Sequence, residues 1–432
     1  MKNFKIIIAF ILFSSQLFSQ RVPAEFEKQD GILFTWLLEN QLENESVDLV
    51  HLQMVENLIK ENIVYINYHN KSQKTKIEKL LATKSIDLNR IKFLKYDISM
   101  GSYPRDYGPE WIYDNQKLNI VDMNWTFYGY IPPERSFAKM INKNLESYDR
   151  FLAENLNLKT YKKSQFVSEG GGKEFNGNGV LMVVEQTELQ RNPKYSKQEI
   201  EAEYKRIFNL KKIIWLPKPS YDDENMFKDY IIDQATNQKI IRAASANGHI
   251  DEFCRFVSPN TILLAEVSQS EADSEEIHKI NKERFDECFE ILKKETDADG
   301  KPYTIIRMPI AETIFKEVTK KSGVGINISS MIEATELKKM LDGSDFPKED
   351  KFLVLPALSY CNFSIANNVV LMSKYWKTSL PESIKEKDKQ AFDILQKIFP
   401  NRKIVAIDAM ALNLGGGGLH CNTKHIPTLN EN

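Results

Sequence analysis

The chain has 432 residues, a formal net charge of −2 at pH 7, and 42% hydrophobic against 27% charged residues. This composition is ordinary for a globular protein with a sizeable core. A charge so close to zero gives no support for nucleic-acid binding or for a basic face on an anionic membrane. Beyond the N-terminus, no stretch approaches the roughly eighteen unbroken apolar residues of a membrane-spanning helix.

Residues 1–20 have the pattern of an export signal. Lys2 and Lys5 precede the apolar run 6–13, and a short polar run follows as far as Gln20. A charged start, a short apolar core and a small residue near the exit are typical of a cleaved signal peptide. The apolar run is too short for a membrane anchor. We therefore expect residues 1–20 to be a secretory signal, with the rest of the chain periplasmic or secreted.

The cysteines do not form a disulfide framework. The chain has four, Cys254, Cys288, Cys361 and Cys421, with no paired CxxC spacing among them. Exported proteins often use disulfides, but a chain of this length has core enough without them. We expect mostly free thiols.

The apolar periodicity predicts alternating strands and helices in chain order. The predicted strands are 32–36, 63–67, 91–94, 179–184, 212–216, 252–257, 261–266, 303–308, 362–365, 369–372 and 403–407. The predicted helices are 47–60, 72–82, 197–208, 274–295 and 387–399. A hairpin, a helix and a strand recur at long intervals, which predicts repeated α/β modules within one domain. Five such modules would fit the length, and three of them are well defined.

Reactive side chains occur in four stretches whose glycines or prolines favour loops. They are residues 103–109 with Asp106, 168–172 with Glu169, 247–253 with His249 and Asp251, and 413–424 with Cys421. A plain turn without chemistry is a good interpretation of each stretch taken alone. If the third stretch enters the strand predicted after it, His249 and Asp251 point to the same face, because side chains alternate along a strand.

Three kinds of site are compatible with these residues. A metal site would recruit His249, Asp251, His420 and Cys421, but His420 and Cys421 are adjacent and would project oppositely in an extended loop. A papain-like site needs a cysteine near the mature N-terminus, whereas Cys421 lies at the far end. The third kind is attack by a thiolate on an electron-poor carbon held by carboxylates. Pairs of carboxylates suit a planar guanidinium, because their hydrogen bonds to it are bidentate and charge-assisted.

Six segments, in order along the chain, together resemble the agmatine deiminase family, which includes the Porphyromonas-type peptidylarginine deiminases. They are residues 22–31, 105–109, 169–172, 248–253, 360–363 and 415–421. The resemblance implies a five-bladed α/β propeller, the pentein fold, built of repeated ββαβ units. It also implies that residues 21–432 form a single deiminase catalytic domain, without a metal or an organic cofactor.

The same resemblance implies roles for five residues. Cys421 matches the nucleophile and His249 the general acid and base. Asp106 and Asp251 match the carboxylates that hold the guanidinium, and Glu169 matches an acid that orients the histidine. The implied reaction is hydrolytic deimination through a covalent thiouronium intermediate, for example of agmatine to N-carbamoylputrescine and ammonia.

The substrate is left open between agmatine and a peptide with C-terminal arginine. Asn362, Trp125 and Gly418 are candidates for substrate contact in either case. The Porphyromonas-type enzyme has a pair of arginines downstream of its Arg-Asp-Tyr-Gly-Pro motif, whereas residues 121–135 here contain one, Arg135, as a candidate partner for a carboxylate. The aromatic segment favours a small guanidino substrate, and the export signal favours extracellular peptides. Between the two we favour the small substrate, agmatine, with peptidylarginine as the alternative.

Two further functions remain open at this stage. An amidinotransferase of the same fold would pass the amidino group to an amine instead of water. A non-catalytic binding protein is disfavoured because nucleophile, base and carboxylates are all present. The sequence predicts no nucleic-acid partner and no membrane partner once the signal is removed, and it does not reveal the oligomeric state.

Overall fold

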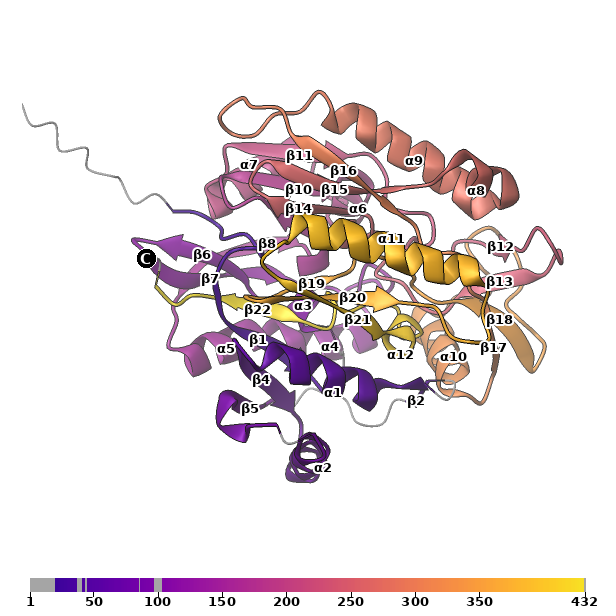
Figure 1. The fold of residues 1–432 in the computed structure, drawn as a ribbon, viewed down its shortest axis with the longest axis horizontal. Coiled ribbons are helices and arrows are strands. Elements are labelled where there is room, and N and C mark those ends of the chain that lie inside the picture. Colours follow the sequence, from indigo (N-terminus) through magenta and orange to yellow (C-terminus); the bar gives the residue numbers. More distant parts are fainter. Residues whose placement is uncertain (1–19, 37–40, 43–44, 85, 97–102, 431–432) are drawn as a thin grey trace, which may run out of the picture.

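The computed structural model describes residues 20–430, apart from residues 37–40, 43–44, 85 and 97–102. The predicted signal peptide therefore lies outside the described residues, except for Gln20. The described chain is a mixed α/β protein, and Figure 1 shows helices α9, α11 and α1 as successive layers beside the strands that they connect. Among the described helices, none combines the length and the apolar character needed to cross a membrane.

Five sheets in the described part of the chain share one pattern of pairing. In each, a strand pairs antiparallel with its neighbour and parallel with the strand that follows one or two helices. Long connections containing helices are what parallel neighbours require. The ββαβ unit predicted from the sequence is thus present in five sheets.

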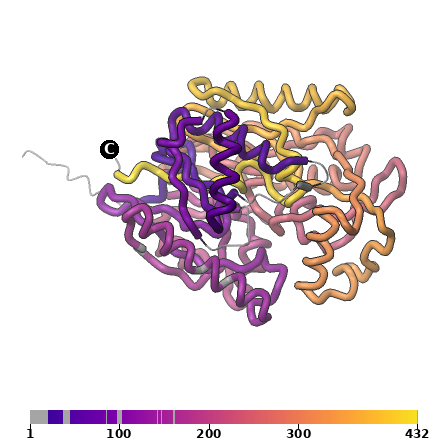
Figure 2. The backbone as a smooth tube through the Cα atoms, turned by 90° about the horizontal axis from the view of Figure 1, so that it is seen from below, coloured from indigo at the N-terminus to yellow at the C-terminus, as the bar shows by residue number. Residues whose placement is uncertain are grey.

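The first two sheets use strands from both ends of the chain. The first has the order β22-β1-β4-β5 and contains β1 Gln29–Thr35, α1 Val47–Leu58, β4 Ile63–Tyr68, α2 Lys71–Ala82, a 3-10 turn Leu88–Arg90, β5 Ile91–Lys95 and β22 Lys424–Pro427. The second contains β6 Glu110–Asp114, β7 Lys117–Asn124, α4 Ser136–Glu146, α5 Tyr148–Leu156 and β8 Thr160–Val167. Because β22 pairs with β1, the C-terminal strand completes the first sheet, and Figure 2 shows these two segments side by side.

The other three sheets follow in chain order. The third contains β9 Lys173–Phe175, β10 Val180–Val184, α6 Glu185–Arg191, α7 Lys197–Phe208 and β11 Lys212–Leu216. The fourth contains β14 Cys254–Ser258, β15 Thr261–Glu266, α8 Gln269–Ser274, α9 Glu276–Leu292 and β16 Thr304–Pro309. The fifth contains β19 Ser364–Ile365, β20 Val369–Lys374, α11 Glu382–Ile398 and β21 Lys403–Asp408.

A further sheet is inserted between these units. Its order is β12-β13-β18-β17, with β12 Ile231–Ile232, β13 Lys239–Arg242, β17 Lys316–Thr319, α10 Gly323–Thr335 and β18 Lys351–Leu355. The remaining short elements are β2 Gln41–Leu42, β3 Glu45–Ser46, α3 Pro104–Tyr107, the 3-10 turns Gly170–Gly172 and Ile250–Glu252, and α12 Met410–Asn413. Several of these short elements carry the candidate site residues.

Local sequence explains why the repeated elements form. All five side chains of β10, Val-Leu-Met-Val-Val, are buried, as expected for a central strand with a parallel neighbour. Helix α7 starts with a capping box, in which Ser196 and Glu199 each bond to the other's backbone N–H. It ends at Asn209, whose left-handed conformation asparagine tolerates better than most residues.

The apolar core lies between consecutive sheets. Ile32 of β1 shares one cluster with Leu371 of the fifth sheet, and Leu33 shares another with Trp111 of the second. Ile112 of the second sheet shares a third cluster with the third sheet, and the largest cluster joins the third, fourth and fifth sheets. Each unit is therefore held by the units before and after it, including across the chain ends.

Several predicted elements need correction. His249 and Asp251 do not lie on a strand, because a 3-10 turn, Ile250–Glu252, precedes β14 and delays the strand to Cys254. The predicted helix 274–295 is α9, which runs from Glu276 to Leu292; the separate helix α8 before it was not predicted, and Glu275, with extended backbone angles, divides the two. All four cysteines are free, which agrees with the prediction of mostly free thiols, and all four are also buried.

Candidate active site

The loop after α12 places the thiol of Cys421. A Cβ on Gly417 would lie 2.9 Å from the Cβ of Cys421, and one on Gly418 would lie 2.5 Å from Oδ1 of Asn362. Both distances are below normal van der Waals contact, so the glycines let the loop fold tightly around the cysteine. The glycine run identified in the sequence is thus a packing requirement of this loop.

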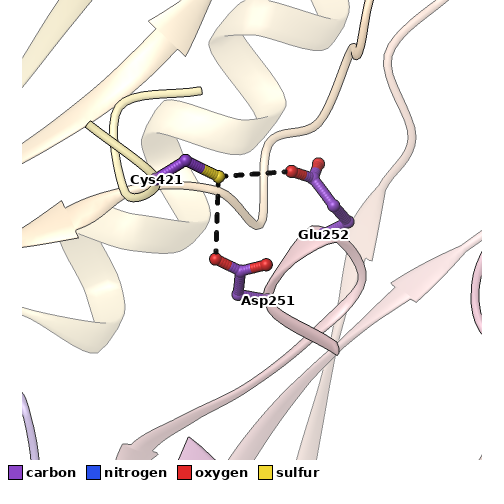
Figure 3. Close-up of side chains that lie close together, drawn as sticks. All are labelled: Asp251, Glu252 and Cys421. Carbon is purple, nitrogen blue, oxygen red and sulfur yellow. Dashed lines mark hydrogen bonds between the residues drawn. The ribbon is translucent and has the colours of Figure 1, made fainter. Parts of the chain in front are cut away.

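Cys421 is buried and contacts three polar side chains. The amide Nδ2 of Asn362 donates a hydrogen bond to Sγ at 3.1 Å. The other two partners are Asp251 Oδ2 at 3.9 Å and Glu252 Oε1 at 3.8 Å, and Figure 3 shows them approaching the sulfur from two different directions. The sulfur therefore has an amide donor and two carboxyl groups around it.

His249, Asp106 and Asp251 converge on Gly171. A Cβ on Gly171 would lie 2.5 Å from His249 Nδ1, 2.9 Å from Asp106 Oδ1 and 3.1 Å from Asp251 Oδ2. Asp106 sits in α3 and is fixed by two donors, the backbone N–H of Gly171 and the hydroxyl of Tyr128, each at 3.0 Å. Three of the predicted site residues from three distant segments are thus within reach of one point.

Glu169 supports His249 from the opposite side of the ring. Its Oε2 lies 3.8 Å from Nε2 of His249, while Nδ1 of the same ring lies 3.6 Å from Asp106 Oδ1. The guanidinium of Arg191 donates to both carboxylate oxygens of Glu169, at 2.9 and 3.1 Å. The charge of Arg191 helps to hold the pKa of Glu169 at about 2, although burial acts to raise it. Glu169 is therefore ionised and rigidly placed.

The resting charges of the site differ from one group to the next. Burial raises the pKa of Cys421 well above its usual value, and the negative charges of Asp251 and Glu252 add to this. Burial acts to lower the pKa of His249, but the carboxylates of Asp106, Glu169 and Asp251 outweigh it and raise the pKa to about 9. At neutral pH the site thus pairs a neutral thiol with an imidazolium.

A buried chain of ionic groups lies behind Asp251. His420 bridges two carboxylates, with Nδ1 2.6 Å from Asp251 Oδ2 and Nε2 2.6 Å from Glu25 Oε2. Glu25 in turn contacts Arg105 at 3.0 Å and Arg255 at 3.5 Å. Burial acts to raise the pKa of Asp251, but the hydrogen bond and charge of His420 lower it below its usual value. Asp251 is therefore ionised and backed by cations.

This arrangement corrects the expectation that His420 and Cys421 project oppositely. Both side chains reach the same oxygen of Asp251, because the chain turns at these residues instead of running extended. A metal site remains conceivable for another set, Asp251, Glu252 and Cys421, whose ligand atoms lie within 4.8 Å of one another. However, the amide of Asn362, a donor and not a ligand, already lies against the sulfur.

A cavity of about 340 Å³ leads to the thiol. Cys421 and Asp106 lie in its wall, and Trp125 lines it together with other aromatic side chains, notably Tyr103, Phe127, Tyr128 and Phe137. The indole N–H of Trp125 is buried without a hydrogen-bond partner in the described structure. The described lining residues include no lysine or arginine. The cavity, called the aromatic cavity below, is thus mainly apolar with seven aromatic side chains in its lining, and Cys421 and Asp106 are its reactive groups.

The other predicted contacts lie outside this lining. Asn362 and Gly418 are buried in the wall behind Cys421, where they contact each other. Arg135 is placed elsewhere: its Nη1 donates to the carbonyl of Thr335 at 2.8 Å and lies 3.1 Å from Glu336 Oε2. Arg135 therefore ties the start of α4 to the end of α10 and does not line the cavity.

Sequence reasoning missed several residues of this site. Glu25 lies within the resembling segment 22–31, and Glu252 directly follows Asp251, so both were in motifs without being singled out. Arg191 gave no signal, because it reaches the site from the end of an ordinary helix, and Tyr128 was part of the aromatic segment 121–135 without being singled out. His420 was considered only as a metal ligand.

Three comparisons place the chain among known proteins. "Putative agmatine deiminase 2" of Listeria monocytogenes is 28% identical over 334 residues, covering 75% of this chain and 73% of that protein. The solved structure of agmatine deiminase of Enterococcus faecalis has a TM-score of 0.69 at 21% identity, covering 94% of this chain and 96% of the other. A C. jejuni agmatine deiminase with substrate bound has a TM-score of 0.65 at 19% identity, covering 95% and 97%.

The two solved structures have the same mixed α/β fold as this chain, from one end of the described part to the other. A family model described as Porphyromonas-type peptidyl-arginine deiminase matches residues 21–427. This match spans all the site residues described above. The chain belongs to the Porphyromonas-type peptidyl-arginine deiminase family.

Proposed function

We propose that the protein hydrolyses the guanidino group of agmatine, giving N-carbamoylputrescine and ammonia. One observation carries this proposal: Cys421 and Asp106 meet in the wall of an aromatic cavity, with His249 and Asp251 in contact behind them. The relatives at 28–29% identity are named as agmatine deiminases, which points to the same substrate.

The carboxylates explain how a guanidinium would be held. Asp251 is ionised, and Asp106 presents its second oxygen beside Tyr128 at the cavity wall. Two carboxylates bind a planar cation through bidentate, charge-assisted hydrogen bonds and so orient its central carbon. The cation also favours the thiolate form of Cys421, because an adjacent positive charge lowers a thiol pKa.

The chemistry then proceeds through a covalent adduct. The Cys421 thiolate attacks the guanidinium carbon, and the tetrahedral adduct loses ammonia after the imidazolium of His249 gives its proton to the departing nitrogen. Water, deprotonated by the neutral His249, attacks the thiouronium and releases the ureido product and the thiolate. Glu169, fixed by Arg191, keeps His249 oriented throughout.

The cavity favours agmatine over a peptide with C-terminal arginine. A volume of about 340 Å³ is at the small end of the range of roughly 300–1,000 Å³ for ligand pockets. A C-terminal carboxylate would need a positively charged partner, and the described lining residues include no lysine or arginine. Arg135, the candidate for this role, is paired with Glu336 instead. The aromatic faces of Trp125 and Phe127 suit the terminal ammonium of agmatine through cation–π attraction.

Peptidylarginine is the second candidate, because the matching family model is named for that activity. Ammonia release from agmatine, free arginine and a peptide with C-terminal arginine separates the two. We expect release from agmatine, lost in Cys421→Ala and kept in Cys288→Ala, which removes a buried thiol distant in sequence from the site. Release from the peptide alone would replace agmatine with peptidylarginine, and release from none would reject the deiminase function.

We also propose that the five ββαβ sheets are the blades of a five-bladed α/β propeller. In support, every sheet shares an apolar cluster with the units on both sides, and β22 joins the last segment to the first sheet. A crystal structure in which the five sheets do not surround a common axis would contradict this.

We further propose that residues 1–20 are removed on export and that residues 21–432 act as one catalytic domain. The charged start and short apolar core of residues 1–13 support this. N-terminal sequencing of the protein recovered from the cell exterior should begin near Gln20 to Pro23. Recovery of intact chain from the cytoplasm alone would reject it.

A further inference from the structure

A second, smaller cavity lies behind Glu252, whose carboxyl group contacts Cys421. Its volume is about 40 Å³, and its wall includes Glu252, Asp222, His278, Glu312 and Ser220. No described residue lines both this rear cavity and the aromatic cavity in front of Cys421. The lining passes from buried residues such as Glu252 to partly exposed ones such as Glu312, so the rear cavity runs from the site toward the surface.

Glu252 joins the rear cavity to the reacting sulfur. Its Oε1 lies 3.8 Å from Sγ of Cys421 and accepts a hydrogen bond from Nδ2 of Asn362 at 2.8 Å. Figure 3 shows this carboxyl group pointing at the sulfur from a different direction than that of Asp251. The contact between Glu252 and Cys421 is therefore where the two cavities meet.

The rear cavity has the features of a site for water. Oγ of Ser220 and Nδ1 of His278 belong to its lining and are buried without a hydrogen-bond partner among the described residues. Such groups are normally satisfied by ordered water. Since a water needs roughly 10–15 Å³ by this measure, a cavity of about 40 Å³ has room for about three.

The charge of the rear cavity favours a cation over an anion. Asp222, Glu252 and Glu312 contribute three carboxyl groups, and no lysine or arginine is among the described lining residues. Burial raises the pKa of Glu252 well above its usual value, and the charges of Asp251, Asp223 and Asp222 add to this. These effects favour the protonated, neutral form of Glu252, which can exchange its proton with water beside it, so the attraction for a cation comes from Asp222 and Glu312.

We infer that the rear cavity is a solvent path through which ammonia leaves and the hydrolytic water enters while the substrate occupies the front cavity, with Glu252 at its inner end. This inference rests on the proposed deimination. After the C–N bond breaks, ammonia must be exchanged for water before the thiouronium can be hydrolysed. During this exchange the thiouronium adduct still blocks the aromatic cavity, because the carbon chain of the substrate lies in it.

The balance of the exchange is simple. Substrate guanidinium and Cys421 thiolate give the alkylthiouronium and ammonia, with the proton on the departing nitrogen supplied by His249. Ammonia takes up a proton from the carboxyl group of Glu252 and leaves as ammonium, drawn by the other carboxyl groups of the rear cavity. Water arrives by the same path, gives one proton to His249, and its oxygen becomes the ureido oxygen. Its second proton, released when the tetrahedral adduct expels the thiolate, returns to Glu252.

Ser220 allows the path to be closed with little other change. Its hydroxyl has no hydrogen-bond partner in the described structure, so Ser220→Leu removes no bond and places a larger apolar group in the cavity. Ser220→Ala is the matched control, because it removes the same hydroxyl and leaves the cavity open. Thermal unfolding of both variants shows whether each is folded.

The test is steady-state kinetics with agmatine, together with intact mass of the acid-quenched enzyme. Ser220→Leu should lower kcat roughly tenfold, lower KM in parallel, and accumulate an adduct of enzyme plus substrate minus ammonia, whereas Ser220→Ala should behave as wild type. Glu252→Gln, which keeps an acceptor for Asn362 but cannot exchange protons, should also accumulate the adduct; it serves if Ser220→Leu does not fold.

Two results would overturn the inference, and they are distinguishable. If the wild type turns over agmatine and neither folded variant loses rate or accumulates adduct, the rear path is wrong and the deiminase function stands. If the wild type releases no ammonia from any guanidine and forms no adduct on Cys421, the proposed function fails and the path fails with it.

Discussion

The imidazole of His249 is buried among carboxylates, and this sets its charge at working pH. Without them, burial would lower its pKa; with Asp106, Glu169 and Asp251 around it, the pKa rises to about 9. A group whose folded pKa is raised keeps its proton below that value and loses it as the pH rises through it. His249 is thus poised as an acid over the neutral range.

Replacing Glu169 should move the alkaline limit of activity. Glu169→Gln removes one of the carboxylates that raise the pKa of His249, so the imidazolium should lose its proton at lower pH. We expect the alkaline limb of kcat/KM to lie near pH 9 in the wild type and at least about one unit lower in the variant. Glu317→Gln, at an exposed carboxylate, is the control. An unchanged limb would show that Glu169 does not tune the histidine.

Arg135 makes a different prediction from the one its sequence position suggested. It is partly exposed and paired with Glu336, away from the cavity lining. Exposed ion pairs contribute at most about 1 kcal/mol, so Arg135→Ala should leave KM and kcat within about threefold of wild type and lower stability only slightly. Kinetics with agmatine and with a C-terminal arginine peptide check this. A large rise in KM for the peptide would restore Arg135 as a carboxylate-binding residue.

At the scale of elements, the loop after α12 depends on glycine for contact distances. A side chain on Gly418 would displace Asn362, whose Oδ1 would be 2.5 Å from the new Cβ. The amide of Asn362 donates to Sγ of Cys421, and its Oδ1 accepts from the backbone N–H of His420. The loop after α12 and the loop before β19 therefore act together to hold Cys421 in place.

Gly418→Ala should impair the reaction more than the fold. A Cβ only 2.5 Å from Oδ1 must displace Asn362 by about half an ångström or more, which misplaces the sulfur; we expect kcat to fall by up to roughly a hundredfold, the loss that a misplacement of about 1 Å can cause. Gly300→Ala is the control for an added methyl group, because a Cβ there meets nothing within 4 Å; its φ of +82° costs backbone strain, so it should lower stability and not kcat. Circular dichroism and kinetics of the two variants check this. Equal activity of both would show that the tight contact at Gly418 is not needed.

Elements with regular apolar periodicity were predictable from sequence, and those without it were not. Helix α7 and strand β10 agree with their predicted ranges to within one residue. The apolar residues of α7 recur on one buried face, and β10 is apolar and buried along its whole length, so both patterns are clear in the sequence. The strands of the second sheet were missed: β7 alternates irregularly between buried and exposed positions. β12 has only two residues, too few for any period.

The same reason separates the predictable site residues from the others. Cys421, His249, Asp106 and Glu169 stand beside glycines or prolines that mark functional loops, so the chain itself indicates them. Glu25 meets His420 across 395 residues, and Arg191 meets Glu169 from the end of an ordinary helix. Such contacts depend on which units pack against one another in the fold, and local sequence patterns do not predict that packing.

At the scale of the whole molecule, the two ends of the chain meet at the site. β22 pairs with β1, and three residues before β22 lies Cys421. Glu25, four residues before β1, contacts Arg105 and His420, so the N-terminal segment is tied to the segment that bears the nucleophile. The buried ionic groups around Glu25 therefore do two things: they join the N-terminal and C-terminal segments, and through His420 they position Asp251.

Removing Glu25 should consequently cost both stability and activity. Burial acts to raise the pKa of Glu25, but Arg105 and His420 lower it well below its usual value, so it is ionised inside the protein. Glu25→Ala leaves these cations buried without their partner, which typically destabilises a protein by about 3–5 kcal/mol. It also frees His420 from one of its two carboxylates and so loosens Asp251.

Urea unfolding followed by tryptophan fluorescence, with ammonia release measured below the transition, tests this linkage. Glu317→Ala, which breaks the exposed pair with Lys351, should unfold near the wild-type midpoint and keep full activity. Glu25→Ala should unfold at lower urea and remain less active even where it is fully folded, because Asp251 no longer has a fixed support. A variant that loses stability but keeps wild-type kcat would separate the two roles, and would mean that β22 and β1 close the molecule without setting the geometry of the site.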